Sequence, residues 1–332
     1  MDAQAQAVSP FLLDTNVQYA WDSTSLGYLK TCPRLYQYTM IEGWGHAEES
    51  VHLRFGTELH KALQEYEVLR AKGISREPAI REVVYDLLAR TRDWIVDEDS
   101  RAGKYKNRAS LIRAAVDYFD HYVKDAAQTY ILPNGKPAVE LSFRFELDWG
   151  PKFGYSLGTE IGPSEYEVKS WTPYLLCGHL DRVVTFNDDL YVLDLKTTTS
   201  TPGSYYFDQY HPSNQMTLYT LASQVILGTT VKGVIIEAAQ IAIGFTRFTR
   251  GMTYRTPDQL EEWLADLRYW LALAEGYATE GYWPQNDTAC DKFGGCRFRE
   301  ICSKSPQVRG QFLKSKFEQL PLGDRWNPLR SR

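Results

Sequence analysis

The sequence predicts an α/β fold with a central mixed sheet flanked by helices. Residues 178–196 read as two short apolar strands around an Asn-Asp-Asp turn, and strand-like runs also occupy 138–149 and 231–243. Apolar residues recur at helical spacing in 55–66, 79–96, 108–128 and 256–280. These elements together indicate one α/β core that is interrupted by a helical insertion.

The first part of the chain is expected to be mainly helical. A polar arm at 1–20 precedes a Ser/Thr cluster at 23–25, one of whose residues can cap the first helix. The helix at 55–66 carries an apolar stripe on one face. Two further helices, at 79–96 and 108–128, form the insertion.

The expected sheet elements come next in the chain. Apolar and polar residues alternate in 138–149, as they do in a half-buried strand. The Thr-, Ser- and Tyr-rich residues 197–212 are long enough to form an active-site loop. A helix capped by Ser213 follows, and the strand at 231–243 and the amphipathic helix at 256–280 complete the core.

Composition indicates a globular protein. The chain has 332 residues, of which 43% are hydrophobic and 14% aromatic, enough for a sizeable core. A formal net charge of −5 argues against a protein that coats nucleic acid nonspecifically, although a local basic surface can still bind DNA. No apolar run approaches the ~18 residues that span a bilayer, and the N-terminus lacks a secretory pattern. Five cysteines, an odd count in a chain without an export signal, indicate a reducing compartment. We therefore expect a cytoplasmic protein that makes no membrane contact.

The two strands and the turn at residues 178–196 form an expected hairpin, and its charged residues indicate its chemistry. Asp181 lies in the first strand, while Asp194 and Lys196 share one face of the second. With Asp188 and Asp189 at the centre of the turn, Asp181 lies opposite Lys196 and diagonal to Asp194. Carboxylates buried together call for a cation, and oxygen ligands favour Mg²⁺ or Mn²⁺. A solvated cross-strand salt bridge is the alternative, which the apolar flanks disfavour.

At these residues the sequence resembles the PD-(D/E)XK nuclease superfamily. In that superfamily an Asp is followed, one strand later, by an acidic residue, any residue and a Lys. The chain is similar to the RecB-type exonuclease branch, which includes CRISPR-associated four-cysteine nucleases and the nuclease domains of recombination helicases. The resemblance implies a restriction-endonuclease-like core that hydrolyses DNA. Asp181, Asp194 and the carbonyl of Leu195 would hold Mg²⁺ or Mn²⁺, and Lys196 would position and polarise the attacking water.

Three further residues match motifs of the same branch. His60 follows Gly56 in a Gly-x-x-x-His spacing, which the branch uses for a metal-binding imidazole. Taken alone, a histidine beside an apolar helix face is more often structural. Gln215 and Tyr219 share a helix face and match a Gln-x-x-x-Tyr motif, whose residues would orient Lys196 or the DNA backbone.

The family also carries an acidic residue on the strand that leads into the Asp motif. Glu140 is the candidate for this metal ligand, with Glu146 and Asp148 as competitors on the same strand. A solvent-exposed glutamate on the polar face of a strand is the ordinary alternative.

Cysteines mark a second site. Cys290, Cys296 and Cys302 are separated by gaps of five residues, and Cys32 is the best fourth ligand for a tetrahedral thiolate site. Zinc and an iron–sulfur cluster both suit such a set. The resemblance implies a [4Fe-4S] cluster that joins the N- and C-terminal segments, although the family often has gaps of two and then five residues. Cys177, in an apolar strand, is expected in the core.

The expected organisation has four parts. They are an arm at 1–20, a nuclease core at 21–68 and 138–303, a helical insertion at 69–137 and a tail at 304–332. The insertion contains a basic stretch that is either a solvated loop or a source of phosphate contacts, with Arg101, Lys104, Lys106 and Arg108. The tail mixes Arg and Lys with Phe and Trp, and it could bind DNA or a partner or pack back on the core.

Two other function classes stay open at this point. One is a catalytically silent DNA-binding or partner subunit on the same scaffold, and the other is a zinc-stapled interaction module. The expected partners of the nuclease are DNA with a free end and proteins of a recombination or CRISPR-type system.

Overall fold

The computed structural model describes residues 9–46, 50–151, 172–291 and 295–330. The chain forms two compact units. The first unit comprises residues 1–47, 143–178 and 261–332, and the second unit comprises 48–142 and 179–260. The division into arm, core, insertion and tail stays a prediction.

The second unit holds most of a mixed sheet. Strands β5 (Leu175–Phe186), β6 (Asp189–Thr198), β7 (Gly233–Ile241) and β8 (Thr246–Tyr254) are neighbours in that order. The β5/β6 and β7/β8 pairs are antiparallel, whereas β6 and β7 run parallel. Strands β3 (Gln128–Thr129) and β4 (Val139–Glu146) also pair with β5. The predicted α/β fold with a central mixed sheet is confirmed.

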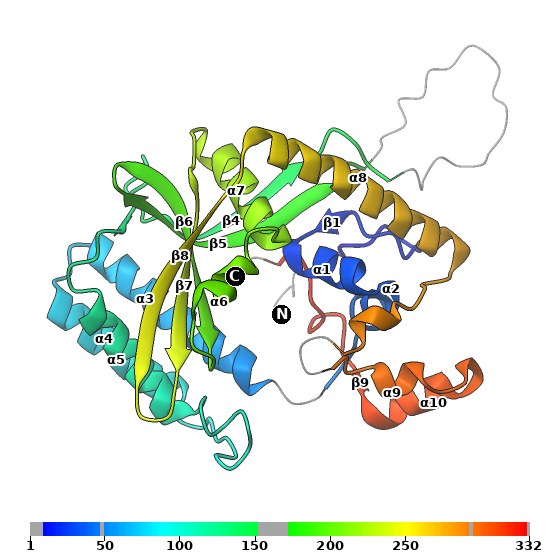
Figure 1. The fold of residues 1–332 in the computed structure, drawn as a ribbon, viewed down its shortest axis with the longest axis horizontal. Helices are drawn as coiled ribbons and strands as arrows, with labels where there is room; N and C mark the ends of the chain where they lie inside the picture. The colour runs from blue at the N-terminus through cyan, green and yellow to red at the C-terminus, as the bar shows by residue number, and fades with distance from the viewer. Residues whose placement is uncertain (1–8, 47–49, 152–171, 292–294, 331–332) are drawn as a thin grey trace, which may run out of the picture. The chain divides into compact units, whose positions relative to one another are not determined.

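Helices cover this sheet. Helices α3 (Val51–Ala71), α4 (Arg76–Arg90) and α5 (Arg108–His121) share one apolar cluster with β6, β7 and β8 and lie grouped beside the sheet (Figure 1). Helix α7 (Asn214–Leu227) packs against β6 and β7, and the short α6 (Ser204–Asp208) lies in the connection before it. All nine residues of β7 are buried, as expected of a central strand covered on both faces.

The first unit is mainly helical. It contains α1 (Ser23–Thr31), α2 (Pro33–Tyr36), a π-helical turn (Gln37–Ile41), most of α8 (Pro257–Glu280), a 3₁₀ turn (Asp287–Ala289), α9 (Arg299–Cys302) and α10 (Pro306–Lys316). Strand β1 (Ala20–Trp21) runs parallel to the start of β5, and β2 (Trp44–Gly45) pairs with β9 (Glu318–Gln319). Phe317 of the tail lies in one apolar cluster with Tyr38 and Phe298, so this part of the tail packs on the first unit.

Several boundaries differ from the sequence-based expectation. Asp22, not a residue of the 23–25 cluster, caps α1, because its carboxylate accepts a 2.8 Å hydrogen bond from the Ser25 amide. Ser213 caps α7 as predicted. The helix expected at 108–128 ends at His121, since Gln128 and Thr129 pair with β5 instead. Strand β8 was not predicted.

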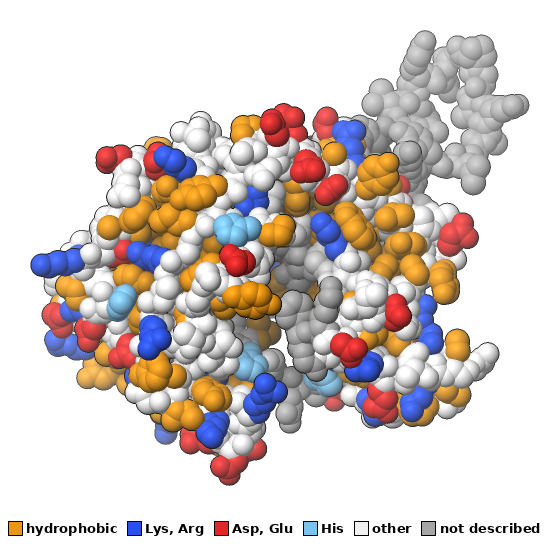
Figure 2. All heavy atoms as spheres, viewed as in Figure 1, with side chains coloured by type: hydrophobic (Ala, Val, Ile, Leu, Met, Phe, Trp, Pro, Cys, Tyr) orange, Lys and Arg blue, Asp and Glu red, His pale blue; other side chains and the backbone are white. Residues whose placement is uncertain are grey.

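The surface carries mixed charge. Figure 2 shows Lys and Arg side chains interspersed with Asp and Glu over the face in view. None of the helices in the described part of the chain has the length and apolar character needed to cross a bilayer.

Candidate metal centre

The β5–β6 turn decides which charged side chains meet. Asn187 and Asp188 form its centre, with φ angles of 49° and 65°. Two consecutive residues in the left-handed region are typical of a type I′ hairpin, and Asn and Asp tolerate this region better than most residues. Phe186 therefore pairs with Asp189 directly beside the turn.

This register places Asp181 opposite Asp194 when it is continued along the strands. The prediction that Asp181 lies opposite Lys196 is wrong, because the turn is centred one residue earlier than expected. Asp194 and Lys196 share a face as predicted, and Lys196 Nζ lies 2.9 Å from Oδ1 and 2.8 Å from Oδ2 of Asp194.

Burial controls the charge of this pair. Asp194 is only 1% exposed, and burial raises the pKa of Asp194 to about 6, with Asp181 adding to the rise and Lys196 opposing it. Burial lowers the pKa of Lys196, but the carboxylates of Asp194 and Asp181 outweigh that effect and leave the pKa raised. Lys196 is therefore an ammonium group held against a buried carboxylate.

Three side chains that can bind a metal lie close together here, and the Leu195 carbonyl contacts one of them. His60 on α3, Glu140 on β4 and Asp181 on β5 each offer a ligand atom, and these atoms lie within 4.8 Å of one another. His60 Nδ1 is 3.2 Å from Asp181 Oδ2, and His60 Nε2 is 3.0 Å from the carbonyl oxygen of Leu195. The Leu195 amide donates a 3.1 Å hydrogen bond to Asp181 Oδ2. One imidazole, two carboxylates and a carbonyl form a donor set that suits Mg²⁺ or Mn²⁺.

Glu140 reaches this set through an unusual backbone conformation. Its φ is 47°, although it lies inside a strand, where residues have negative φ. A non-glycine residue in the left-handed region costs of order 1–3 kcal/mol and is retained where the surroundings require it. The conformation turns Glu140 toward His60 and Asp181, and neither Glu146 nor Asp148 belongs to the donor set.

The Gln-x-x-x-Tyr pair lies on one face of α7. Gln215 Nε2 donates a 2.9 Å hydrogen bond to the hydroxyl of Tyr219. The predicted sharing of a helix face is confirmed. Their predicted role toward Lys196 or DNA stays a prediction.

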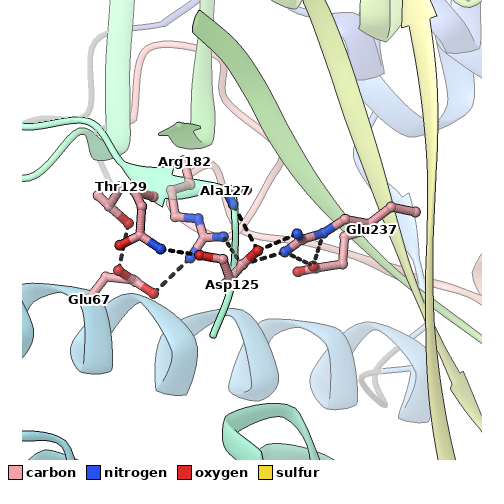
Figure 3. A network of polar contacts seen from close by, with 8 residues as sticks. Glu67, Asp125, Ala127, Thr129, Arg182 and Glu237 are labelled. Carbon is pink, nitrogen blue, oxygen red and sulfur yellow. Dashed lines mark hydrogen bonds and ion pairs between the residues drawn. The ribbon is translucent and has the colours of Figure 1, made fainter. Parts of the chain in front are cut away.

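A network of charged side chains begins at Arg182, the residue after Asp181 (Figure 3). Arg182 forms ion pairs with Glu67 at 2.7 Å and Asp125 at 3.7 Å. Arg250 on β8 binds Asp125 at 2.6 Å and Glu237 at 2.6 Å. Two guanidinium groups therefore face three carboxylates.

Three residues of the network, Glu67, Arg182 and Glu237, line a cavity of about 40 Å³ together with the donor set. Such a volume holds about two or three water-sized bodies. Glu237 is 0% exposed, and buried charges persist only where they are paired. Asp181 and Arg182 are consecutive residues of β5, so the ion pairs of Arg182 also hold the backbone that carries Asp181.

Sequence reasoning missed this network. A signal was present in the run Gly233–Ile241, in which Glu237 is the single charged residue of an apolar strand. A lone carboxylate in such a strand requires a buried cationic partner. The partner is Arg250, and its identity depends on the β7/β8 register, which places Arg250 directly opposite Glu237.

Lys106 differs from the expectation for the basic stretch. It is buried, and its Nζ donates a 2.7 Å hydrogen bond to Thr197 Oγ1 and lies 5.4 Å from the centre of the Phe55 ring. Burial lowers the pKa of Lys106 to about 8. Lys106 therefore ties the helical segment to the end of β6 and is not a surface phosphate contact.

The cysteines gather in the first unit. Cys32, Cys290, Cys296 and Cys302 line one small cavity together with Phe298. Burial raises the pKa of the Cys302 thiol to about 11. Cys177 is buried in β5, as predicted.

The family model of the PD-(D/E)XK nuclease superfamily matches residues 23–303, which is most of the chain. The chain belongs to this superfamily. The match spans every residue of the donor set, Lys196 and all four clustered cysteines. PD-(D/E)XK nucleases hydrolyse phosphodiester bonds with divalent metals, so the convergence of His60, Glu140 and Asp181 agrees with the family.

Two solved structures are similar to this PD-(D/E)XK chain. A crystal structure of a candidate exonuclease from Eubacterium rectale shares 12% identity with a TM-score of 0.45, covering 82% of this chain and 86% of that one. The crystal structure of SSO0001 shares 10% identity with a TM-score of 0.28, covering 76% of each chain. The comparison with curated proteins finds no match.

Proposed function

We propose that the protein is a metal-dependent DNA nuclease that acts as an exonuclease on free DNA ends. The observation that carries this proposal is the meeting of His60, Glu140, Asp181 and the Leu195 carbonyl beside an ammonium group held by Asp194. A catalytically silent subunit would have no use for a strained Glu140 or for two buried charges at 194 and 196.

Each residue of the site has its own proposed role. His60, Glu140, Asp181 and the carbonyl of Leu195 would hold Mg²⁺ or Mn²⁺, with Asp194 completing the set. When bound, the ion lowers the pKa of a water molecule and stabilises negative charge on the phosphate. Lys196 holds the attacking water by a hydrogen bond from Nζ, and the carboxylate of Asp194 orients that ammonium. Gln215 and Tyr219 position the DNA backbone.

A divalent-metal assay tests this function. We expect linear DNA to be degraded with Mg²⁺ or Mn²⁺ and to be left intact with EDTA. Asp181→Asn should lower the rate by at least ~10²-fold, since it removes a charged ligand of the ion. Gel analysis of linear and circular, single- and double-stranded DNA measures both effects.

Asp189→Asn is the matched control for this assay. Asp189 lies at the turn end of the same hairpin, has a side chain that is 43% exposed and pairs with Lys232. Its replacement should leave the rate unchanged. Cleavage that persists in EDTA, or an Asp181→Asn variant as active as the parent, would contradict the proposal.

We also propose that the four cysteines bind a [4Fe-4S] cluster. Cys32, Cys290, Cys296 and Cys302 line one small cavity. A four-iron cluster takes one thiolate from each of four cysteines. Zinc also takes four thiolates, and metal analysis distinguishes the two.

Metal analysis tests the cluster. We expect the purified protein to be brown and to contain iron without zinc. Cys302→Ala should lose the colour and the iron and should lower the melting temperature, because the cluster joins segments more than 250 residues apart. The control is Cys177→Ala, which removes a thiol outside the site. A colourless protein that contains zinc, or iron retained in Cys302→Ala, would refute the assignment.

A further inference from the structure

The connection between β6 and α7 carries a group of aromatic side chains that the mechanism above does not use. We call residues 199–212 the tyrosine loop; it includes α6 and contains Tyr205, Tyr206, Phe207 and Tyr210. The loop starts three residues after Lys196 and belongs to the same compact unit as the donor set.

The loop is anchored near its start and its middle. The Gln240 amide on β7 donates a 3.1 Å hydrogen bond to Thr201 Oγ1. The ring of Phe207 lies against Gly251 on β8, where a Cβ atom would overlap the ring. Glycine at this position of β8 therefore lets the loop approach the sheet closely.

Arg255 anchors the end of the loop. Its Nη2 donates a 2.9 Å hydrogen bond to the carbonyl of Tyr210, while Nε donates to Thr217 Oγ1 at 2.8 Å and Nη1 to Thr253 Oγ1 at 2.7 Å. One guanidinium group thus connects the loop to α7 and to β8. With three anchors, the loop is held in one place relative to the catalytic strand.

The anchored loop presents a group of tyrosines in the connection that directly follows β6. Tyr206 packs edge-on against Tyr210, with ring centres 5.8 Å apart and hydroxyl groups 3.3 Å apart. Tyr206 and Tyr210 therefore form one aromatic pair in the loop that follows β6. Tyr205, the neighbour of Tyr206, is 89% exposed.

We propose that the tyrosine loop is a stacking platform for the unpaired bases of single-stranded DNA, whose backbone then passes Lys196. Neutral aromatic rings bind nucleic acid through the faces of its bases, and each stacked base contributes substantially to affinity. In a duplex these faces are covered by neighbouring base pairs, so rings of this kind select a single strand. Stacking also needs no broad basic surface, in agreement with the net charge of −5.

This inference rests on the proposed nuclease function and names its substrate class. Tyr205→Ala should raise KM for a single-stranded oligothymidylate by about tenfold or more, with little change in kcat, because a lost stack weakens binding and not chemistry. Tyr205→Phe keeps the ring and should restore the parental KM. The control is Tyr85→Ala, which removes a 67% exposed tyrosine from α4, outside the site, and should change neither constant.

Binding in EDTA separates this inference from the nuclease function. Fluorescence anisotropy of a labelled oligothymidylate should show about tenfold weaker binding by Tyr205→Ala and parental binding by Tyr205→Phe and Tyr85→Ala. If the parent protein cleaves no DNA, the nuclease proposal fails while the binding assay still decides the platform. If it cleaves only duplexes, or if Tyr205→Ala binds and cleaves the single strand like the parent, the platform is refuted and the nuclease function stands.

Discussion

Lys196→Met is expected to lower DNA cleavage by at least ~10²–10³-fold, the usual effect of removing a group that stabilises charge in the transition state. The ammonium lies 2.8 Å from the buried carboxylate of Asp194 and has no second lysine beside it on β6. Methionine keeps most of the side-chain volume but cannot donate a hydrogen bond to the attacking water. Single-turnover cleavage of a labelled DNA measures the loss.

Metal binding distinguishes a catalytic lysine from a structural one. In Lys196→Met the proposed ligands His60, Glu140 and Asp181 are intact, so Mn²⁺ should still raise the melting temperature. Lys232→Met is the matched control, since Lys232 also pairs with an aspartate but is 53% exposed on the surface. Parental cleavage by Lys196→Met, or loss of the Mn²⁺ effect in this variant, would show that Lys196 does not have the assigned role.

The second large effect is expected from Arg250→Met. This change leaves Glu237, which is 0% exposed, without the guanidinium that lies 2.6 Å away. It also removes the strongest partner of Asp125. Breaking a buried ion pair from one side costs about 3–5 kcal/mol, so the free energy of unfolding should fall by that amount. Chemical denaturation followed by circular dichroism measures the change.

Two further variants test the cause of this loss. Arg247→Met removes an exposed arginine from the same strand and should change the free energy of unfolding by less than about 0.5 kcal/mol. Adding Glu237→Gln to Arg250→Met removes the unpaired carboxylate and should restore part of the stability. An Arg250→Met protein as stable as the parent would mean that the network of Figure 3 carries little of the folding energy.

Local patterns predicted most of the fold. Alternation identified β4, β5 and β6, and apolar spacing identified α3, α4, α5 and α8. The predicted ends of the helices were less accurate than their central residues. A cap such as Asp22, or a competing strand such as β3, depends on contacts that apolar spacing alone does not show. Strand β8 was missed because polar residues dominate its sequence, and it is a strand through its pairing with β7.

The side chains that we propose as catalytic were likewise visible in the sequence, whereas their geometry was not. The Asp-x-Lys spacing puts Asp194 and Lys196 on one face of any strand, so their ion pair could be predicted from two residues alone. Asp181 could not be placed in the same way, since its partner depends on whether the turn is centred on Asn187 or one residue later.

The sequence by itself determined the α/β class, the chemistry of the acidic and basic residues, and the spacing of the thiols, because all three follow from short-range order along the chain. Only the tertiary structure decided that Glu140 adopts a left-handed backbone conformation and joins His60 and Asp181. It also decided that Arg182 and Arg250 neutralise buried carboxylates. Finally, it showed that Gly251 lets the tyrosine loop lie close to β8. These contacts join residues distant in sequence, and each depends on strand register and close packing.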